Sequence, residues 1–203
     1  MNAVELIALA SSVSLLAGWR VYFVTFATGL AMKLGWVDLP ERLQALDVLA
    51  SNWVIAIAAA GAFAEFFADK IAWVDSGWDA VHTFVRPVGG ALLSLAIVDA
   101  GDPAWQIGSF LLGGAAAFTA HAGKAGARSL VNASPEPFSN IAVSTGEDIV
   151  TGGLLALAIS NPIAAVLVAL ILVIASLWLV LAARRALRRL FGPQRRPAGS
   201  TSQ

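Results

Sequence analysis

Residues 163–183 read IAAVLVALILVIASLWLVLAA, a run that carries no charged side chain. A helix of this length is about 31 Å long, which matches the hydrocarbon core of a bilayer, about 30 Å thick. Helices of water-soluble proteins keep one polar face, whereas this run is apolar all round. The run therefore predicts a transmembrane helix and decides the class of the protein.

The composition of the whole chain agrees with this class. Of the 203 residues, 58% are hydrophobic and only 13% are charged, against about 45–50% and about 25% in ordinary soluble domains. The mean hydropathy is +0.77. A globule of this size cannot bury so much apolar surface in one core, so lipid must solvate the remainder.

Working outward from 163–183, five earlier segments are long and apolar enough, or nearly so, to cross a bilayer. We expect an all-α, polytopic transmembrane helical bundle of about six spans, built as one domain over residues 1–191. Residues 192–203 are rich in Pro, Gly, Ser and Thr, so we expect a disordered cytoplasmic tail. The expected spans are 3–36, 53–70, 79–98, 104–124, 146–160 and 162–183.

The first segment is too long for one perpendicular span, because about 33 residues of helix extend about 50 Å. Ser11, Ser12, Ser14 and Gly18 are weak points. Two interpretations stay open: a broken or re-entrant hairpin with its tip near residues 18–20, and a single tilted span with one end in water, which we favour slightly.

Loop charges predict the orientation. If the second, fourth and sixth spans end on one side, that side collects Lys70, Lys124, Arg128 and six basic residues between Arg184 and Arg196. Positively charged loops face the cytoplasm, so we expect a cytoplasmic C-terminus. The other side collects Asp38, Glu41, Asp47, Asp99 and Asp102, and residues 39–49 predict a short amphipathic helix on that surface.

The chain also contains a candidate internal repeat. Residues 53–70 align with 107–124, which matches Lys70 to Lys124, and residues 92–97 align with 154–159. Each unit is a two-span hairpin, so the two copies would run in the same direction through the membrane.

Ionisable residues inside the predicted spans are the best candidates for a site, because such groups are costly in lipid. Arg20 lies about 24 Å and Glu65 about 18 Å from the outer interface, which predicts an ion pair between them. Acids of the second span would face bases of the fourth, where His121, Lys124 and Arg128 form one helical stripe. Arg86 would face Glu147 or Asp148.

We therefore predict a polar binding site between the second and fifth spans. The competing interpretations are a purely structural ion pair, solvated loop flanks for the charges near the interface, and an ordinary exposed turn for the Asn132–Asn140 loop. The candidate substrate-binding residues are Arg20, Glu65, Asp69, Lys70, Arg86, His121, Lys124, Arg128, Asn132, Asn140, Glu147 and Asp148.

The sequence gives little support for catalysis, for a bound haem or metal, or for nucleic-acid binding. The chain has no Cys, and it lacks HExxH, GxSxG and DxD-like patterns, so catalysis is the weaker interpretation. His82 and His121 alone are poor evidence for haem or metal, and we expect no cofactor. The short basic tail without interleaved aromatic residues speaks against nucleic acid. The paired glycines at 89–90, 113–114 and 152–153 indicate close helix packing.

Several strings together resemble a bacterial integral-membrane family catalogued as domain of unknown function 4126. They are Gly18-Trp19-Arg20-Val21, Ala68-Asp69-Lys70-Ile71, Val74-Asp75 with Asp79, Arg86-Pro87, His121-Ala122-Gly123-Lys124, Asn132-Ala133, Pro137-Phe138-Ser139-Asn140 and Glu147-Asp148. The resemblance covers about residues 5–185. It implies a bacterial cytoplasmic (inner) membrane location and no activity. Ala72 departs from the family pattern, which has proline there, and this leaves the shape of that turn open.

Three functions compete. A small transporter or permease would bind an anionic group at its bases and a coupling proton or cation at its carboxylates. A lipid-handling protein would hold a phospholipid or polyprenyl phosphate headgroup at the His121, Lys124 and Arg128 stripe. A non-catalytic scaffold subunit would use all these charges structurally. Expected partners are membrane lipids and a small ion or anionic substrate, and homo-oligomerisation stays open.

Overall fold

The computed structural model describes residues 3–36, 48–98, 102–133 and 137–191, and all regular structure in these ranges is helical. The predicted all-α bundle is therefore confirmed. The helices are α1 (Ala3–Lys33), α2 (Asn52–Ala68), α3 (Ala72–Ile97), α4 (Pro103–Val131), α5 (Pro137–Ser160) and α6 (Pro162–Phe191).

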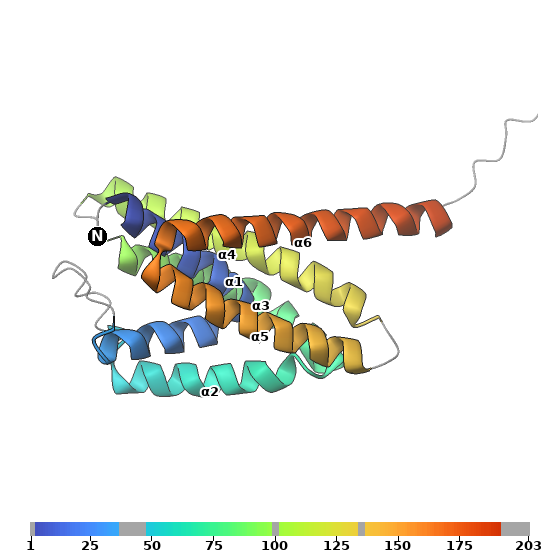
Figure 1. Cartoon of the computed structure of the whole chain (residues 1–203), viewed down its shortest axis with the longest axis horizontal. Coiled ribbons are helices and arrows are strands. Elements are labelled where there is room, and N and C mark those ends of the chain that lie inside the picture. The colour runs from blue at the N-terminus through green and yellow to red at the C-terminus, as the bar shows by residue number, and fades with distance from the viewer. Residues whose placement is uncertain (1–2, 37–47, 99–101, 134–136, 192–203) are drawn as a thin grey trace, which may run out of the picture.

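Four of these helices are long and apolar enough to cross a membrane, which identifies a membrane protein: Val4–Lys33, Ala72–Ile97, Phe138–Ser160 and Pro162–Ala182. The shorter apolar helix α2 has 17 residues. Helices α2, α4 and α6 run from one end of the bundle to the other, and α3 and α5 run back. We call the end where α1 starts the N-terminal end, and the end where α6 finishes the C-terminal end (Figure 1).

Helix α1 is broken at Arg20, whose backbone dihedrals (φ −144°, ψ 69°) are not helical. Its first arm runs inward from the N-terminal end, and its second arm returns to that same end (Figure 1). In the first arm, the Ser12 hydroxyl donates to the Pro162 carbonyl at the start of α6. At the end of the second arm, Lys33 donates to Asn52 at the start of α2.

Segment one is therefore a re-entrant hairpin with Arg20 at its tip, and the single tilted span that we favoured slightly is wrong. The physical reason is that the non-helical backbone at Arg20 turns the chain back, so residues 21–33 return to the N-terminal end. The break leaves the Arg20 guanidinium in the middle of the bundle, among carboxylates.

Small residues set how closely the helices approach α1 and one another. A Cβ added at Gly90 of α3 would lie 2.4 Å from the Ala117 Cβ of α4, and one at Gly113 would lie 2.3 Å from the Ser94 Cβ. These contacts confirm the packing interpretation for two of the glycine pairs, because the α3 and α4 backbones nearly touch. Gly153 differs, since an added Cβ there would meet nothing within 4 Å.

Two further sequence predictions concern segments that lie mostly or wholly outside the described residues. The amphipathic helix at 39–49 falls mostly in 37–47, and the tail at 192–203 falls wholly outside the described residues. The loop before α5 is shorter than expected, because Pro137–Asn140 already forms the first turn of that helix. Helices α2 and α4 run in the same direction, as the repeat requires, but the repeat itself stays a prediction.

The return of α1 can be tested by cysteine labelling, because the natural chain contains no Cys. The exposed positions Val4, Leu34 and Trp73 are suitable for single substitutions. We expect Val4→Cys and Leu34→Cys to react with a membrane-impermeant maleimide from the same side of sealed vesicles, and Trp73→Cys to react from the opposite side. Labelling of Val4→Cys and Leu34→Cys from opposite sides would show that α1 crosses the membrane.

Candidate functional site

The tip of α1 inserts a guanidinium between α2 and α5. Arg20 is 1% exposed, and its Nη1 lies 2.6 Å from the Asp69 Oδ2. Its Nη2 lies 2.9 Å from the Asp148 Oδ1 and donates to the Ser144 carbonyl at 3.2 Å. Because the side chain is withdrawn from solvent, these acceptors replace the water that a free guanidinium would bind.

Lys124 of α4 completes this tip. A broken helix leaves backbone carbonyls without their usual helical donors, and the Trp19 carbonyl accepts from the Lys124 Nζ at 3.1 Å. The same ammonium lies 2.7 Å from the Asp69 Oδ2. One carboxylate thus holds two basic side chains, and Lys124 joins the end of the first α1 arm to α2.

Arg128 binds the turn between α2 and α3. Its Nε lies 3.1 Å from the Asp75 Oδ2, its Nη2 donates to the Asp69 carbonyl, and its Nη1 donates to the Asn140 carbonyl at 3.2 Å. Asn132 adds a 2.6 Å bond from its Nδ2 to the Asp75 Oδ2. Helix α3 begins at Ala72, so alanine occupies the first helical position, where proline is also well suited, and the turn keeps a proline-compatible shape.

Arg86 forms the other half of the site and is fully buried. Its Nη2 lies 2.8 Å from the Glu65 Oε1, and its Nη1 lies 3.0 Å from the Asp79 Oδ1. The same Nη1 lies 2.7 Å from the His121 Nδ1. The His121 Nε2 lies 3.1 Å from the Thr83 Oγ1.

This geometry fixes the protonation state of His121. A guanidinium can only donate, so the His121 Nδ1 must accept from Arg86 and cannot carry a proton. The Nε2 then carries the hydrogen and donates to Thr83, whose hydroxyl donates in turn to the Asp79 carbonyl at 2.9 Å. His121 is therefore neutral and holds Arg86 in place.

The site reaches the protein surface near the C-terminal end of α2. Lys70 lies 3.2 Å from the Asp148 Oδ2, and its ammonium stands over the Phe66 ring. The Glu147 Oε2 lies 3.6 Å from both the Arg20 and the Lys124 nitrogens. The side chains of Lys70, Glu147 and Asp148 are 16–27% exposed, whereas Arg20, Lys124 and Asp69 are at most 2% exposed.

All twelve predicted residues take part in these contacts, although their role stays a prediction. The contacts form two neighbouring networks, one around Arg86 and one around Arg20 and Asp69. We call both together the ionic cluster; its charged members are Arg20, Glu65, Asp69, Lys70, Asp75, Asp79, Arg86, Lys124, Arg128, Glu147 and Asp148. The interpretation of its charges as solvated loop flanks is wrong for most of them, because Asp69, Asp75, Arg86 and Arg128 are buried.

Two predicted pairings are wrong. Glu65 pairs with Arg86, not with Arg20, and Arg86 faces Glu65 and Asp79, not Glu147 or Asp148. The predicted meeting of α2 acids with α4 bases is correct for Asp69 and Lys124. The candidate set lacked Asp75 and Asp79. Asp75 lies four residues before Asp79, and Asp79 lies seven residues before Arg86, so all three residues lie on one face of α3.

The two histidines do not form a haem or metal site with each other. The His82 Nδ1 lies 2.7 Å from the Trp78 carbonyl and its Nε2 lies 3.2 Å from the Tyr22 hydroxyl, while His121 contacts Arg86 and Thr83. Among the described residues, no group of three or more His, Asp or Glu side chains is arranged to hold a metal ion.

A family model described as "Domain of unknown function (DUF4126)" matches residues 7–182. The chain belongs to the DUF4126 family. The match contains every charged residue of the ionic cluster. No curated protein and no solved structure matches the chain.

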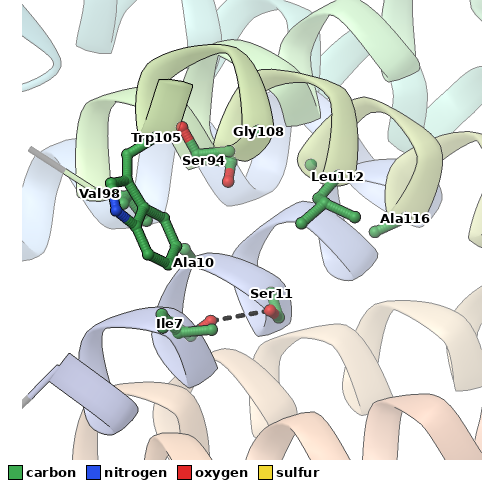
Figure 2. A pocket seen from close by; sticks show the side chains of 11 residues that line it. Ile7, Ala10, Ser11, Ser94, Val98, Trp105, Gly108, Leu112 and Ala116 are labelled. Carbon is green, nitrogen blue, oxygen red and sulfur yellow. Dashed lines mark hydrogen bonds between the residues drawn. The ribbon is translucent and has the colours of Figure 1, made fainter. Parts of the chain in front are cut away.

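Two cavities of contrasting character lie near the bundle surface of this DUF4126 protein, among others formed by the described residues. A pocket of about 120 Å³ at the N-terminal end is lined mainly by apolar residues of α1, α3 and α4, including Ile7, Val98 and Trp105. Its Ser11 hydroxyl donates to the Ile7 carbonyl at 2.8 Å (Figure 2). The pocket lining contains no ionisable side chain, so it offers nothing to hold a charged ligand.

The second cavity is a cleft of about 230 Å³ between α3 and α4. It touches the ionic cluster directly, because Asp79, Thr83, Arg128 and Asn132 lie in its wall. We call it the polar cleft; its lining is Ser76, Asp79, Ala80, Thr83, Ala125, Arg128, Ser129 and Asn132.

The charge balance of the DUF4126 cluster can be tested by removing one partner. We expect Glu65→Leu to lower the free energy of unfolding by about 3–5 kcal/mol, because Arg86 loses a buried counter-charge. Thr119→Leu on the exposed face of α4 is the matched control and should be nearly neutral. Unfolding of both variants in detergent measures the difference, and equal stabilities would mean that Glu65 contributes no compensating charge.

Proposed function

We propose that this protein is a small membrane transporter whose ionic cluster binds a substrate ion together with a coupling proton or cation. The observation that carries the proposal is the Arg20 tip of a re-entrant helix, held by carboxylates from α2 and α5. In secondary transporters, broken helices near the middle of the membrane are the usual place for substrate and ion sites.

The charge balance of the cluster supports an ion-binding role. Its nine ion pairs connect six carboxylates to five basic side chains, and His121 is neutral. With every carboxyl group ionised, the cluster holds one negative charge more than its bases compensate. An uncompensated charge is costly in this environment, so the cluster favours binding one proton or one monovalent cation.

The surplus charge itself lies beside Arg86, which pairs with both Glu65 and Asp79, but Glu147 is the carboxylate best placed to exchange a proton or cation. Its two ion pairs measure 3.6 Å, whereas the shortest ion pairs of the other cluster carboxylates measure 2.6–3.1 Å. Its side chain is also 16% exposed, whereas that of Asp69 is fully buried. A carboxylate that is loosely held and close to the surface can exchange its partner without dismantling the rest of the cluster.

An anionic substrate group would compete for the bases. Arg20 and Lys124 share Asp69 in this arrangement, which satisfies both while the substrate is absent. A bound anion would take the place of a carboxylate beside one of them, and the displaced carboxylate would then take up a proton. Substrate binding and proton uptake are coupled by this exchange.

We also propose the bacterial cytoplasmic membrane as the location, with the C-terminus in the cytoplasm. Arg184 and Arg185 are exposed at the C-terminal end of α6, and loops rich in Lys and Arg stay on the cytoplasmic side. Lys70 lies at the same end of the bundle. The re-entrant α1 then enters from the opposite side.

Proteoliposome flux measurements test the proposal. Purified protein is reconstituted with an internal pH dye, and Na⁺, K⁺, NH₄⁺, chloride and phosphate gradients are imposed in turn. We expect at least one gradient to drive proton flux above that of empty liposomes. We expect Glu147→Gln to lower this flux at least tenfold, because the amide cannot exchange a proton.

Two controls separate coupling from folding. Glu5→Gln, at the start of α1 and far from the cluster, should leave the flux unchanged. The exchange of Glu65→Arg with Arg86→Glu tests the scaffold interpretation, because an intact pair of either polarity satisfies a structural role. Full flux in that double variant would make the Glu65–Arg86 pair structural only. Wild-type flux equal to that of empty liposomes for every gradient would refute transport of these ions.

A further inference from the structure

An apolar groove lies further along the same pair of helices as the polar cleft. The groove has a volume of about 350 Å³ and lies between α3 and α4. It contains no polar side chain, and its lining is Pro87, Val88, Ala91, Phe110, Leu111, Gly114, Ala115 and Phe118. We call the polar cleft and the apolar groove together the α3–α4 seam.

Helical spacing shows that the two cavities lie on one face. Along α3, the lining runs through residues 76, 80, 83, 87 and 91, at steps of three or four. Along α4 it runs through 132, 129, 125, 118, 115 and 111, at steps of three, four or seven. Steps of this kind keep to one helical stripe. The seam is about 22 Å long from residue 76 to residue 91.

The seam opens to the surroundings of the bundle. Val88, Leu111 and Phe118 in its wall are exposed, and in a membrane their surroundings are lipid tails. The polar cleft lies near the end of the bundle, where α3 begins and α4 ends. One half of a bilayer core is about 15 Å thick, so the polar cleft lies at headgroup depth while the groove reaches into the tails.

The polar cleft offers hydrogen-bond acceptors and few donors. The hydroxyls of Ser76, Thr83 and Ser129 donate to carbonyls of their own helices, so only their lone pairs face a ligand. Asn132 uses its Nδ2 to bind Asp75 and Ser76, and its buried Oδ1 has no hydrogen-bond partner. The cleft also contains the Asp79 carboxylate.

Arg128 adds little donor capacity to the cleft. Three of its five N–H groups donate to Asp75, Asn140 and the Asp69 carbonyl, and the residue is only 1% exposed. A ligand in the cleft is therefore recognised by accepting oxygens around a carboxylate. Such a set suits a cation that carries several N–H donors.

We propose that the α3–α4 seam binds one phospholipid with a primary ammonium headgroup. Its ammonium donates to Asp79, Asn132 and the cleft hydroxyls, one acyl chain fills the groove beside Ala115, and the phosphate stays at the water interface. This site goes beyond the proposed transport function and does not depend on it, because it requires only binding.

Native mass spectrometry on the full-length protein tests the site. Delipidated protein is titrated with phosphatidylethanolamine, phosphatidylcholine or phosphatidylglycerol. The first two differ only in the headgroup nitrogen, which has N–H donors in ethanolamine and methyl groups in choline. We expect one tightly bound phosphatidylethanolamine, with at least fivefold weaker binding of the other two lipids.

Two variants locate the binding. Ala115→Trp fills the groove and should lower binding of all three lipids at least fivefold, whereas Ala156→Trp, on an exposed position of α5, is the control and should bind as the wild type does. Asn132→Leu should abolish the preference for ethanolamine over choline. Equal binding of the three lipids by the wild type, or equal binding by Ala115→Trp and Ala156→Trp, would overturn the proposal. Both results are independent of any flux measurement.

Discussion

The structure depends on compensating one buried positive charge, the guanidinium of Arg20. An ion in this position is stable only with partners that replace its hydration, and those partners come from α2 and α5. The break in α1 at the same residue releases the Trp19 carbonyl, which recruits Lys124 from α4. A single residue thus requires four helices to converge, and the re-entrant path of α1 is the geometry that lets them do so.

Each of the two networks of the ionic cluster is held together by groups that have more than one partner. The Asp69 side chain holds Arg20 and Lys124 while its backbone carbonyl accepts from Arg128. Arg86 likewise joins α2, α3 and α4 through Glu65, Asp79 and His121. Because each partner would be left charged and buried if another moved, local changes are coupled within each network. This is the property that a transporter needs and that a set of isolated salt bridges lacks.

The sequence was sufficient to predict the helical bundle and the identity of the converging residues, because both follow from the cost of placing charge in lipid. It was not sufficient to predict the partners. Depths counted along straight helices paired Arg20 with Glu65, but in the structure the guanidinium at the break of α1 lies beside Asp69, four residues further on. The start of α5 was placed at 146 because residues 132–140 resemble a loop, whereas Pro137 is suited to the first turn of a helix.

The α3–α4 seam and the ionic cluster meet at Asp79, which lines the polar cleft and pairs with Arg86. Thr83 forms a second link, since it lines the same cleft and accepts from His121. An ammonium group in the cleft would compete with Arg86 for the Asp79 carboxylate. Arg86 would then rely mainly on Glu65 for its negative charge, and the ammonium would supply the positive charge that the cluster lacks beside Arg86. A bound lipid would thereby reduce the tendency of the cluster to take up a proton or cation.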